Sequence, residues 1–137
     1  MVNIHINYEG DLHCRLEHEP SNTVIATDAP TDNHGRGESF SPTDLVAAAM
    51  GSCMVTTMAI ASKNRNLDLA GTSVQVAKEM ASSPRRIGRL VVNIVLPAHI
   101  QEEDFKFLEN AALTCPVHRS MHPDTVIDFT MRIAGKA

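Results

Sequence analysis

The chain has 137 residues, of which 43% are hydrophobic, and it carries a formal net charge of −4 at pH 7. This length fits one globular domain that buries about two thirds of its unfolded surface, so we expect a single domain over residues 1–137. The acidic charge, one tyrosine and the lack of tryptophan argue against a nucleic acid partner, which needs a basic face and aromatic stacking platforms.

The sequence does not open with a cationic segment, an apolar core and a cleavage site, which predicts a cytoplasmic protein. Its three cysteines are Cys14, Cys53 and Cys115. A reducing compartment does not support a stable disulfide framework, so any pairing among them indicates a transient, catalytic or metal-linked role.

Alternating apolar and polar residues predict two strands at the start of the chain. The apolar positions are Val2, Ile4, Ile6 and Tyr8 in the first strand and Leu12, Cys14 and Leu16 in the second. This pattern makes Cys14 a small residue on the apolar face of a strand, and we assign it no role. Residues 22–28 are expected to form a third strand, and residues 29–40, rich in Gly, Asp, Asn and Pro, a long loop.

A helix is expected from Pro42 to about Asn64, because Ser41 suits the N-cap and Asp44 follows it by three residues, as in a capping box. Residues 45–62 contain no charge, which raises the alternative of a membrane span. The segment is rich in Ala, Gly, Ser and Thr, however, so we predict a helix buried on all sides. One small sheet covers only one side of it, which predicts that the other side meets a second subunit in a homodimer.

Further along, strands are expected at residues 72–80 and 86–96, a second helix at 101–114, and a closing strand at 125–133. The order is therefore three strands, a helix, two strands, a helix and a strand. Runs of strands separated by helices favour an α+β sandwich over a doubly wound sheet.

Two of the thiols lie in settings that suggest chemistry. Cys115 directly precedes Pro116, which suits the first position of a short helical turn, and His118 and Arg119 follow. A helix N-terminus and nearby cations favour the reactive thiolate. Cys53 has neither feature locally, so its cation has to come from elsewhere, with Arg36 and Arg15 as the candidates.

Both thiols are also compatible with roles outside redox chemistry. Cys53 shares a helical stripe with Met50 and Ile60 and suits a place in the core equally well. Cys115, His118 and His122 have a Cys-x2-His-x3-His spacing that suits a metal ion, although no fourth ligand is adjacent. The alternative for the two histidines is that they are solvated or hydrogen-bonded.

Three motifs together resemble the OsmC and organic hydroperoxide resistance (Ohr) family over nearly the whole chain. They are Tyr8-Glu9-Gly10-Asp11, then Ser41-Pro42-Thr43-Asp44-Leu45 leading to Cys53, and Cys115-Pro116-Val117. The resemblance implies an OsmC-like fold in an intertwined homodimer, whose long central helices are wrapped by sheets and whose active sites lie at the subunit interface.

The resemblance also implies a thiol-dependent peroxidase for organic hydroperoxides, active in oxidative stress defence. Cys53 would attack the peroxide, and Cys115 would resolve the sulfenic acid as a disulfide. A dithiol reductant, lipoyl or thioredoxin-like, would reopen the disulfide, and no metal or other cofactor is implied. Apolar residues near Cys53, expected to be Phe40, Met50, Met54 and Met58, would favour an organic peroxide over hydrogen peroxide.

The chain departs from the family pattern at Thr43, where relatives carry the glutamate that pairs with the catalytic arginine. Arg36 is the candidate arginine and Arg15 the alternative, while Glu38 or Asp44 could replace the missing glutamate. The alternative function is an OsmC-like domain that binds a small ligand or senses redox state without turnover.

Overall fold

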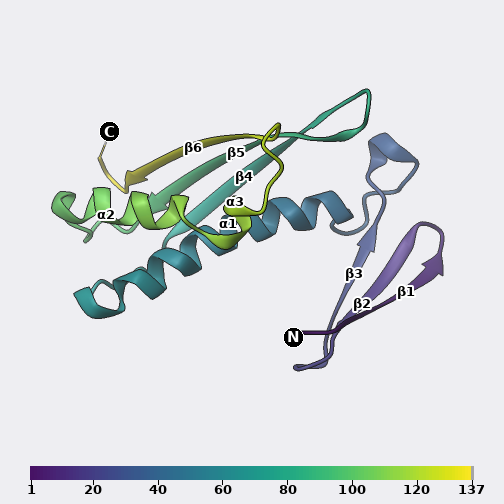
Figure 1. Cartoon of the computed structure of the whole chain (residues 1–137), viewed down its shortest axis with the longest axis horizontal. Helices are drawn as coiled ribbons and strands as arrows, with labels where there is room; N and C mark the ends of the chain where they lie inside the picture. Colours follow the sequence, from purple (N-terminus) through teal and green to yellow (C-terminus); the bar gives the residue numbers. More distant parts are fainter. Residues whose placement is uncertain (137) are drawn as a thin grey trace. The chain divides into compact units, whose positions relative to one another are not determined.

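The computed structural model describes residues 1–136 (Figure 1). The chain forms two compact units, Met1–Val46 and Ala47–Ala137. The first unit holds β1 (Ile4–Gly10), β2 (His13–His18), β3 (Thr23–Asp28) and the start of α1 (Pro42–Ala61). The rest of α1 leads into the second unit, which holds β4 (Ser73–Ala81), β5 (Arg86–Leu96), α2 (Glu102–Leu113), α3 (Pro116–Arg119) and β6 (Val126–Ile133). The predicted order and the α+β class are confirmed.

The N-terminal unit is built on the antiparallel sheet β1-β2-β3. Its register places Ile6 opposite Leu16 and Leu16 opposite Ile25, so that one face of the sheet is apolar. Ile6 is nevertheless 60% exposed, so this unit by itself leaves much of that face open.

The expected place of Leu12 in the second strand is wrong. Asp11 and Leu12 form the turn of the first hairpin, with φ of 51° and 64°. Two successive residues with positive φ match the right-handed twist of the flanking strands, and this turn requirement outweighs the apolar alternation that Leu12 shares with Cys14.

The start of α1 is a reciprocal capping box, as predicted. The backbone N–H of Asp44 donates to Ser41 Oγ at 3.1 Å, and the backbone N–H of Ser41 donates to Asp44 Oδ2 at 2.9 Å. Aspartate reaches back as the usual glutamate does, so two otherwise unpaired donors at the helix start are satisfied.

One face of α1 is buried within the chain. Its buried residues recur at helical spacing and are Ala47, Met50, Gly51, Met54 and Met58. The opposite side is exposed along Ala48, Ser52, Thr56 and Ile60. The single chain therefore covers one side of a helix that was expected to be buried all round.

The segment Pro42–Arg65 is long and apolar enough to span a membrane by length and composition alone, with a mean hydropathy of 1.7 over its best window. A third of that window, 33%, is buried inside the chain. A core helix of a soluble protein passes the same test, so the finding is weak evidence for a span.

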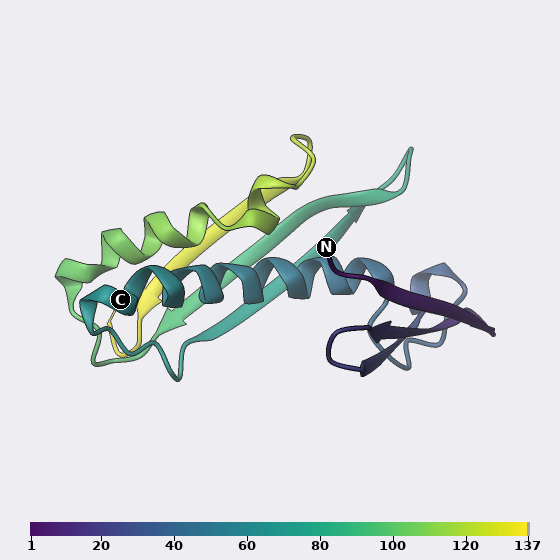
Figure 2. The ribbon, with the colours of Figure 1, turned by 60° about the horizontal axis from the view of Figure 1, so that its bottom comes forward.

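The C-terminal unit packs α1 and α2 along the sheet β4-β5-β6 (Figure 2). β5 pairs antiparallel with β4 and parallel with β6, to which it is linked through α2 and α3. Alternate residues of β5 point into the core and lie opposite the apolar face of β6. These core residues of β5 are Leu90, Val92, Ile94 and Leu96.

Gly51 permits close contact between α1 and β4. A Cβ at this position would lie 2.9 Å from Val76 Cγ2 and 3.1 Å from Val74 Cγ1, closer than carbon atoms pack without strain. A glycine within a helix costs about 1 kcal/mol relative to alanine, so its presence here reflects packing rather than helix propensity.

We expect Gly51→Ala to lower the free energy of unfolding by about 1–3 kcal/mol through overpacking, even though alanine favours the helix. Ser52→Ala, on the exposed side of the same helical turn, is the matched control and should be neutral or slightly stabilising. Urea unfolding followed by circular dichroism measures both. A Gly51→Ala protein as stable as the Ser52→Ala protein would contradict this account of the helix-sheet contact.

Candidate functional site

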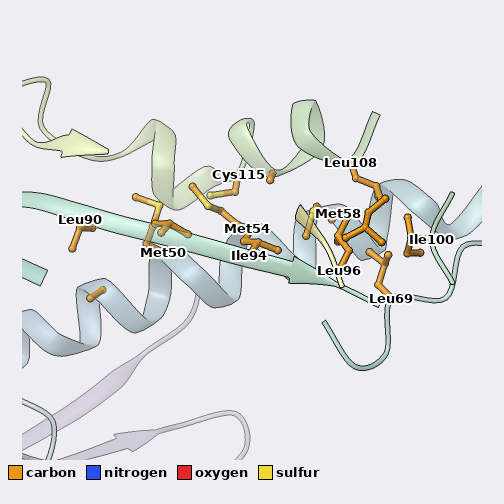
Figure 3. Packing of buried hydrophobic residues seen from close by; sticks show 14 residues of the cluster. Met50, Met54, Met58, Leu69, Leu90, Ile94, Leu96, Ile100, Leu108 and Cys115 are labelled. Carbon is orange, nitrogen blue, oxygen red and sulfur yellow. The ribbon is translucent and has the colours of Figure 1, made fainter. Parts of the chain in front are cut away.

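Cys115 occupies the N-cap of α3, as its position before Pro116 predicts. Its Sγ accepts a hydrogen bond from the backbone N–H of His118 at 3.3 Å. The side chain is 0% exposed and belongs to the apolar cluster between the helices and the sheet (Figure 3). The thiol therefore combines a polar helix start with an apolar environment.

Burial decides the protonation of this thiol. Loss of hydration raises the pKa of Cys115 above its usual value, and the bond from the His118 N–H lowers that pKa only in part. Cys53, which lies beside it, raises the pKa of Cys115 further through a side-chain hydrogen bond and through its charge. Burial therefore outweighs the helix start and the nearby cations that, in the sequence, suggested a reactive thiolate at Cys115.

Cys53 is half-buried on α1 and packs against the same apolar cluster. Its Sγ lies 4.0 Å from Thr57 Oγ1, one helical turn further along. Both thiols are free, and the C-terminal unit brings them together with Cys53 as the more accessible of the two. Cys14, also free, is half-buried on β2 in the other unit.

Methionines of α1 line the core beside the two thiols. Met50, Met54 and Met58 are all 0% exposed and lie in one cluster with Cys115 (Figure 3). Phe40, the fourth residue expected in this apolar environment, lies in the N-terminal unit and is 56% exposed. The described surroundings of the thiols are therefore apolar and rich in methionine.

Both candidate arginines lie in the N-terminal unit, and each has a glutamate partner there. Arg36 Nη1 lies 3.5 Å from Glu38 Oε1, and Arg15 Nη1 lies 2.9 Å from Glu17 Oε2. The Asp44 carboxylate is engaged in the capping box. Of the two replacements considered for the missing glutamate, Glu38 is the one that pairs with Arg36.

The metal alternative at Cys115, His118 and His122 has little support from geometry. The backbone N–H of His118 donates a hydrogen bond to Cys115 Sγ. The His122 side chain is 71% exposed, and its Nδ1 accepts a hydrogen bond from the backbone N–H of Asp124 at 3.0 Å. Within residues 1–136, the group of side chains with metal-ligand geometry is a different one, His13, Asp28 and Glu38.

The sequence patterns did not reveal the pairing of His13 with Asp28. Both sit at strand ends, and they become neighbours only through the pairing of β2 with β3, in which His13 lies opposite Asp28. A correct register for this hairpin would have been the signal, because it places an imidazole and a carboxylate side by side.

Comparison with known proteins agrees with this architecture. The sequence profile of the family described as OsmC-like protein matches residues 35–130. A crystal structure from Psychrobacter arcticus, of a protein provisionally described as an osmotic stress induced and detoxification response protein, is 41% identical, covers 96% of both chains and superposes with a TM-score of 0.91. A search of curated proteins found no match.

More distant structures share the fold. An OsmC-like protein from Mycoplasma pneumoniae is 13% identical with a TM-score of 0.81, covering 97% of this chain and 96% of its own. An organic hydroperoxide resistance protein OsmC from Legionella pneumophila is also 13% identical, with the same coverage and a TM-score of 0.71.

We expect a small alkylating agent such as N-ethylmaleimide to label Cys53 before Cys115 at pH 7, because Cys115 is buried and a raised pKa keeps its thiol protonated. In Cys53→Ser, labelling of Cys115 should keep accelerating above about pH 8.5, the usual pKa of a free thiol. Peptide mass spectrometry over time measures each rate. Faster labelling of Cys115 than of Cys53 at pH 7 would refute the assignment.

Proposed function

Because the chain belongs to the OsmC-like protein family, we propose that it is a thiol-dependent peroxidase that reduces organic hydroperoxides in oxidative stress defence. In this proposal Cys53 is the residue that attacks the peroxide and Cys115 is the residue that resolves the product. The proposal extends to a cytoplasmic location, where a dithiol reductant, lipoyl or thioredoxin-like, restores both thiols.

The reaction has two oxidative steps. The Cys53 thiolate attacks one oxygen of the O–O bond, the bond breaks, and the alkoxide takes up a proton and leaves as an alcohol, so that Cys53 becomes a sulfenic acid. The Cys115 thiol then attacks the sulfenic sulfur, releases water and forms a disulfide. Two electrons and two protons from the dithiol return the disulfide to two thiols.

The observation that carries the proposal is the pairing of one accessible thiol with one buried thiol in an apolar cluster. A peroxide reaches the half-buried Cys53, whereas the protonated and enclosed Cys115 is protected from direct oxidation. The sulfenic acid then forms next to the thiol that has to react with it. Buried methionines around the pair support an organic substrate over hydrogen peroxide.

The positive charge that favours the Cys53 thiolate is assigned to Arg36, with Glu38 as the carboxylate that orients it. In this proposal Glu38 orients the arginine, the function that the family resemblance assigns to a glutamate at the position of Thr43. Arg15, which pairs with Glu17, is the second candidate for the same task.

Peroxide consumption with dihydrolipoamide as reductant tests the proposal. We expect cumene hydroperoxide to be reduced faster than hydrogen peroxide by the wild type, no activity above the uncatalysed rate in Cys53→Ser, and a single turnover in Cys115→Ser. Cys115→Ser should also accumulate a sulfenic acid that dimedone traps at Cys53. A wild type that consumes neither peroxide with any dithiol would overturn the assignment and favour a ligand-binding or redox-sensing role.

The same assay separates the two arginines. Arg36→Gln should slow the reaction of Cys53 with peroxide by roughly tenfold or more, because a nearby cation stabilises the thiolate. Arg15→Gln, matched in chemistry and also paired with a glutamate, should leave that rate close to the wild type. The reverse result would transfer the role to Arg15.

We also propose that the protein is a homodimer, as the resemblance to the family implies. Two apolar surfaces support it: the exposed side of α1 and the uncovered face of β1-β2-β3, which includes Ile4, Ile6 and Tyr8 at 58%, 60% and 66% exposure. This face holds a groove of about 500 Å³ between Ile4, Leu16, Ile25 and Leu45. Exposed apolar patches of this kind mark interaction sites.

Light scattering after size exclusion should give the mass of two chains for the wild type and of one chain for Ile6→Glu, because a charge would be buried in the interface. Asn7→Glu, on the opposite face of the same strand, is the control and should stay dimeric. A wild type that elutes as one chain at micromolar concentration would disprove the dimer.

A further inference from the structure

Three side chains of the N-terminal unit lie close together. His13 begins β2 and Asp28 ends β3, and the two residues lie directly opposite each other in the antiparallel register. Glu38 comes from the loop before α1 and is drawn to the same place, because its backbone N–H donates to Asp28 Oδ2 at 3.0 Å. One ligand atom from each of the three lies within 4.8 Å of the other two.

Asp28 carries an unusual buried oxygen. Its Oδ2 accepts two backbone N–H groups, from Arg36 at 3.2 Å and from Glu38 at 3.0 Å, which closes the loop. Its Oδ1 has no hydrogen-bond partner within residues 1–136, although the side chain is only 1% exposed. The His13 ring lies near this oxygen, and its Nε2 is 3.4 Å away, beyond normal hydrogen-bond length. A buried acceptor without a hydrogen bond destabilises the folded state, so Oδ1 has the capacity to bind a ligand.

The distances match those of a metal site. His13 Nε2 lies 3.4 Å from Asp28 Oδ1 and 3.7 Å from Glu38 Oε2. Ligand atoms placed about 2.1 Å from a tetrahedral zinc ion are about 3.4 Å apart. An imidazole with two carboxylates also leaves one position open for water, as in zinc sites with three protein ligands.

We propose that His13 Nε2, Asp28 Oδ1 and Glu38 Oε2 bind a divalent transition-metal ion such as Zn²⁺. The site contains neither thiol, and it shares Glu38 with the arginine pair of the peroxidase proposal. Arg36 pairs with Glu38 through the other carboxylate oxygen, Oε1. Arg36 thus competes with the ion for Glu38 without occupying the same ligand atom.

Calorimetric titration of the full chain with Zn²⁺, after treatment with a chelator and its removal, tests the site. We expect one ion per chain in the wild type, and at least a tenfold loss of affinity in both His13→Gln and Glu38→Gln, each of which keeps the backbone bonds of the loop. Arg36→Gln should bind Zn²⁺ more tightly than the wild type, because a competing charge is removed.

Two control variants test whether Zn²⁺ binds instead at the thiol pair or at the group Cys115, His118 and His122. Cys53→Ser and His122→Gln should bind Zn²⁺ like the wild type, because neither residue belongs to the proposed site. Circular dichroism should show that all variants are folded. The proposal fails if the wild type binds no ion, if His13→Gln and Glu38→Gln bind as the wild type does, or if binding is lost in Cys53→Ser or His122→Gln instead.

Discussion

The packing of one uncharged helix against a sheet is the constraint on which the candidate site depends. α1 presents Met50, Met54 and Met58 to the core, and Gly51 lets it approach Val74 and Val76 of β4. Cys53 directly precedes Met54, about 100° around the helix from it, and is therefore half-buried at the edge of that stripe. A side chain at this position is held by a rigid core and still reached from outside, which is what a reactive thiol needs.

The balance at Cys115 shows which effect determines thiol chemistry here. A helix start and one N–H bond favour the thiolate, but a helix terminus contributes only about 0.3–1 kcal/mol. Burial has the largest effect on this thiol and outweighs the N–H bond, so the pKa of Cys115 rises. Local sequence alone would therefore misjudge Cys115, whose burial opposes the thiolate.

Features that depend on residues close together in the sequence could be predicted from it, whereas features that depend on distant residues could not. The capping box of Ser41 and Asp44 involves residues three apart, so its chemistry is local and its prediction was correct. The burial of Cys115 depends on α1 and on β5, which lie far away along the chain, so no local pattern reveals it. Leu12 was misplaced because its alternation with Cys14 does not reveal that a two-residue turn occupies positions 11 and 12. The proximity of His13 to Asp28 needed the strand register, which composition alone does not supply.

Two carboxylates near the start of the helix have different partners. Asp44 accepts the backbone N–H of Ser41 in the capping box, and Glu38, two residues after Arg36, pairs with that arginine. Glu38 in turn faces Arg36 with one oxygen and His13 with the other. Its carboxylate therefore contacts two groups, and a cation bound beside His13 and Asp28 would compete with Arg36 for Glu38. Through Glu38, the arginine proposed to activate Cys53 and the proposed metal site share one carboxylate.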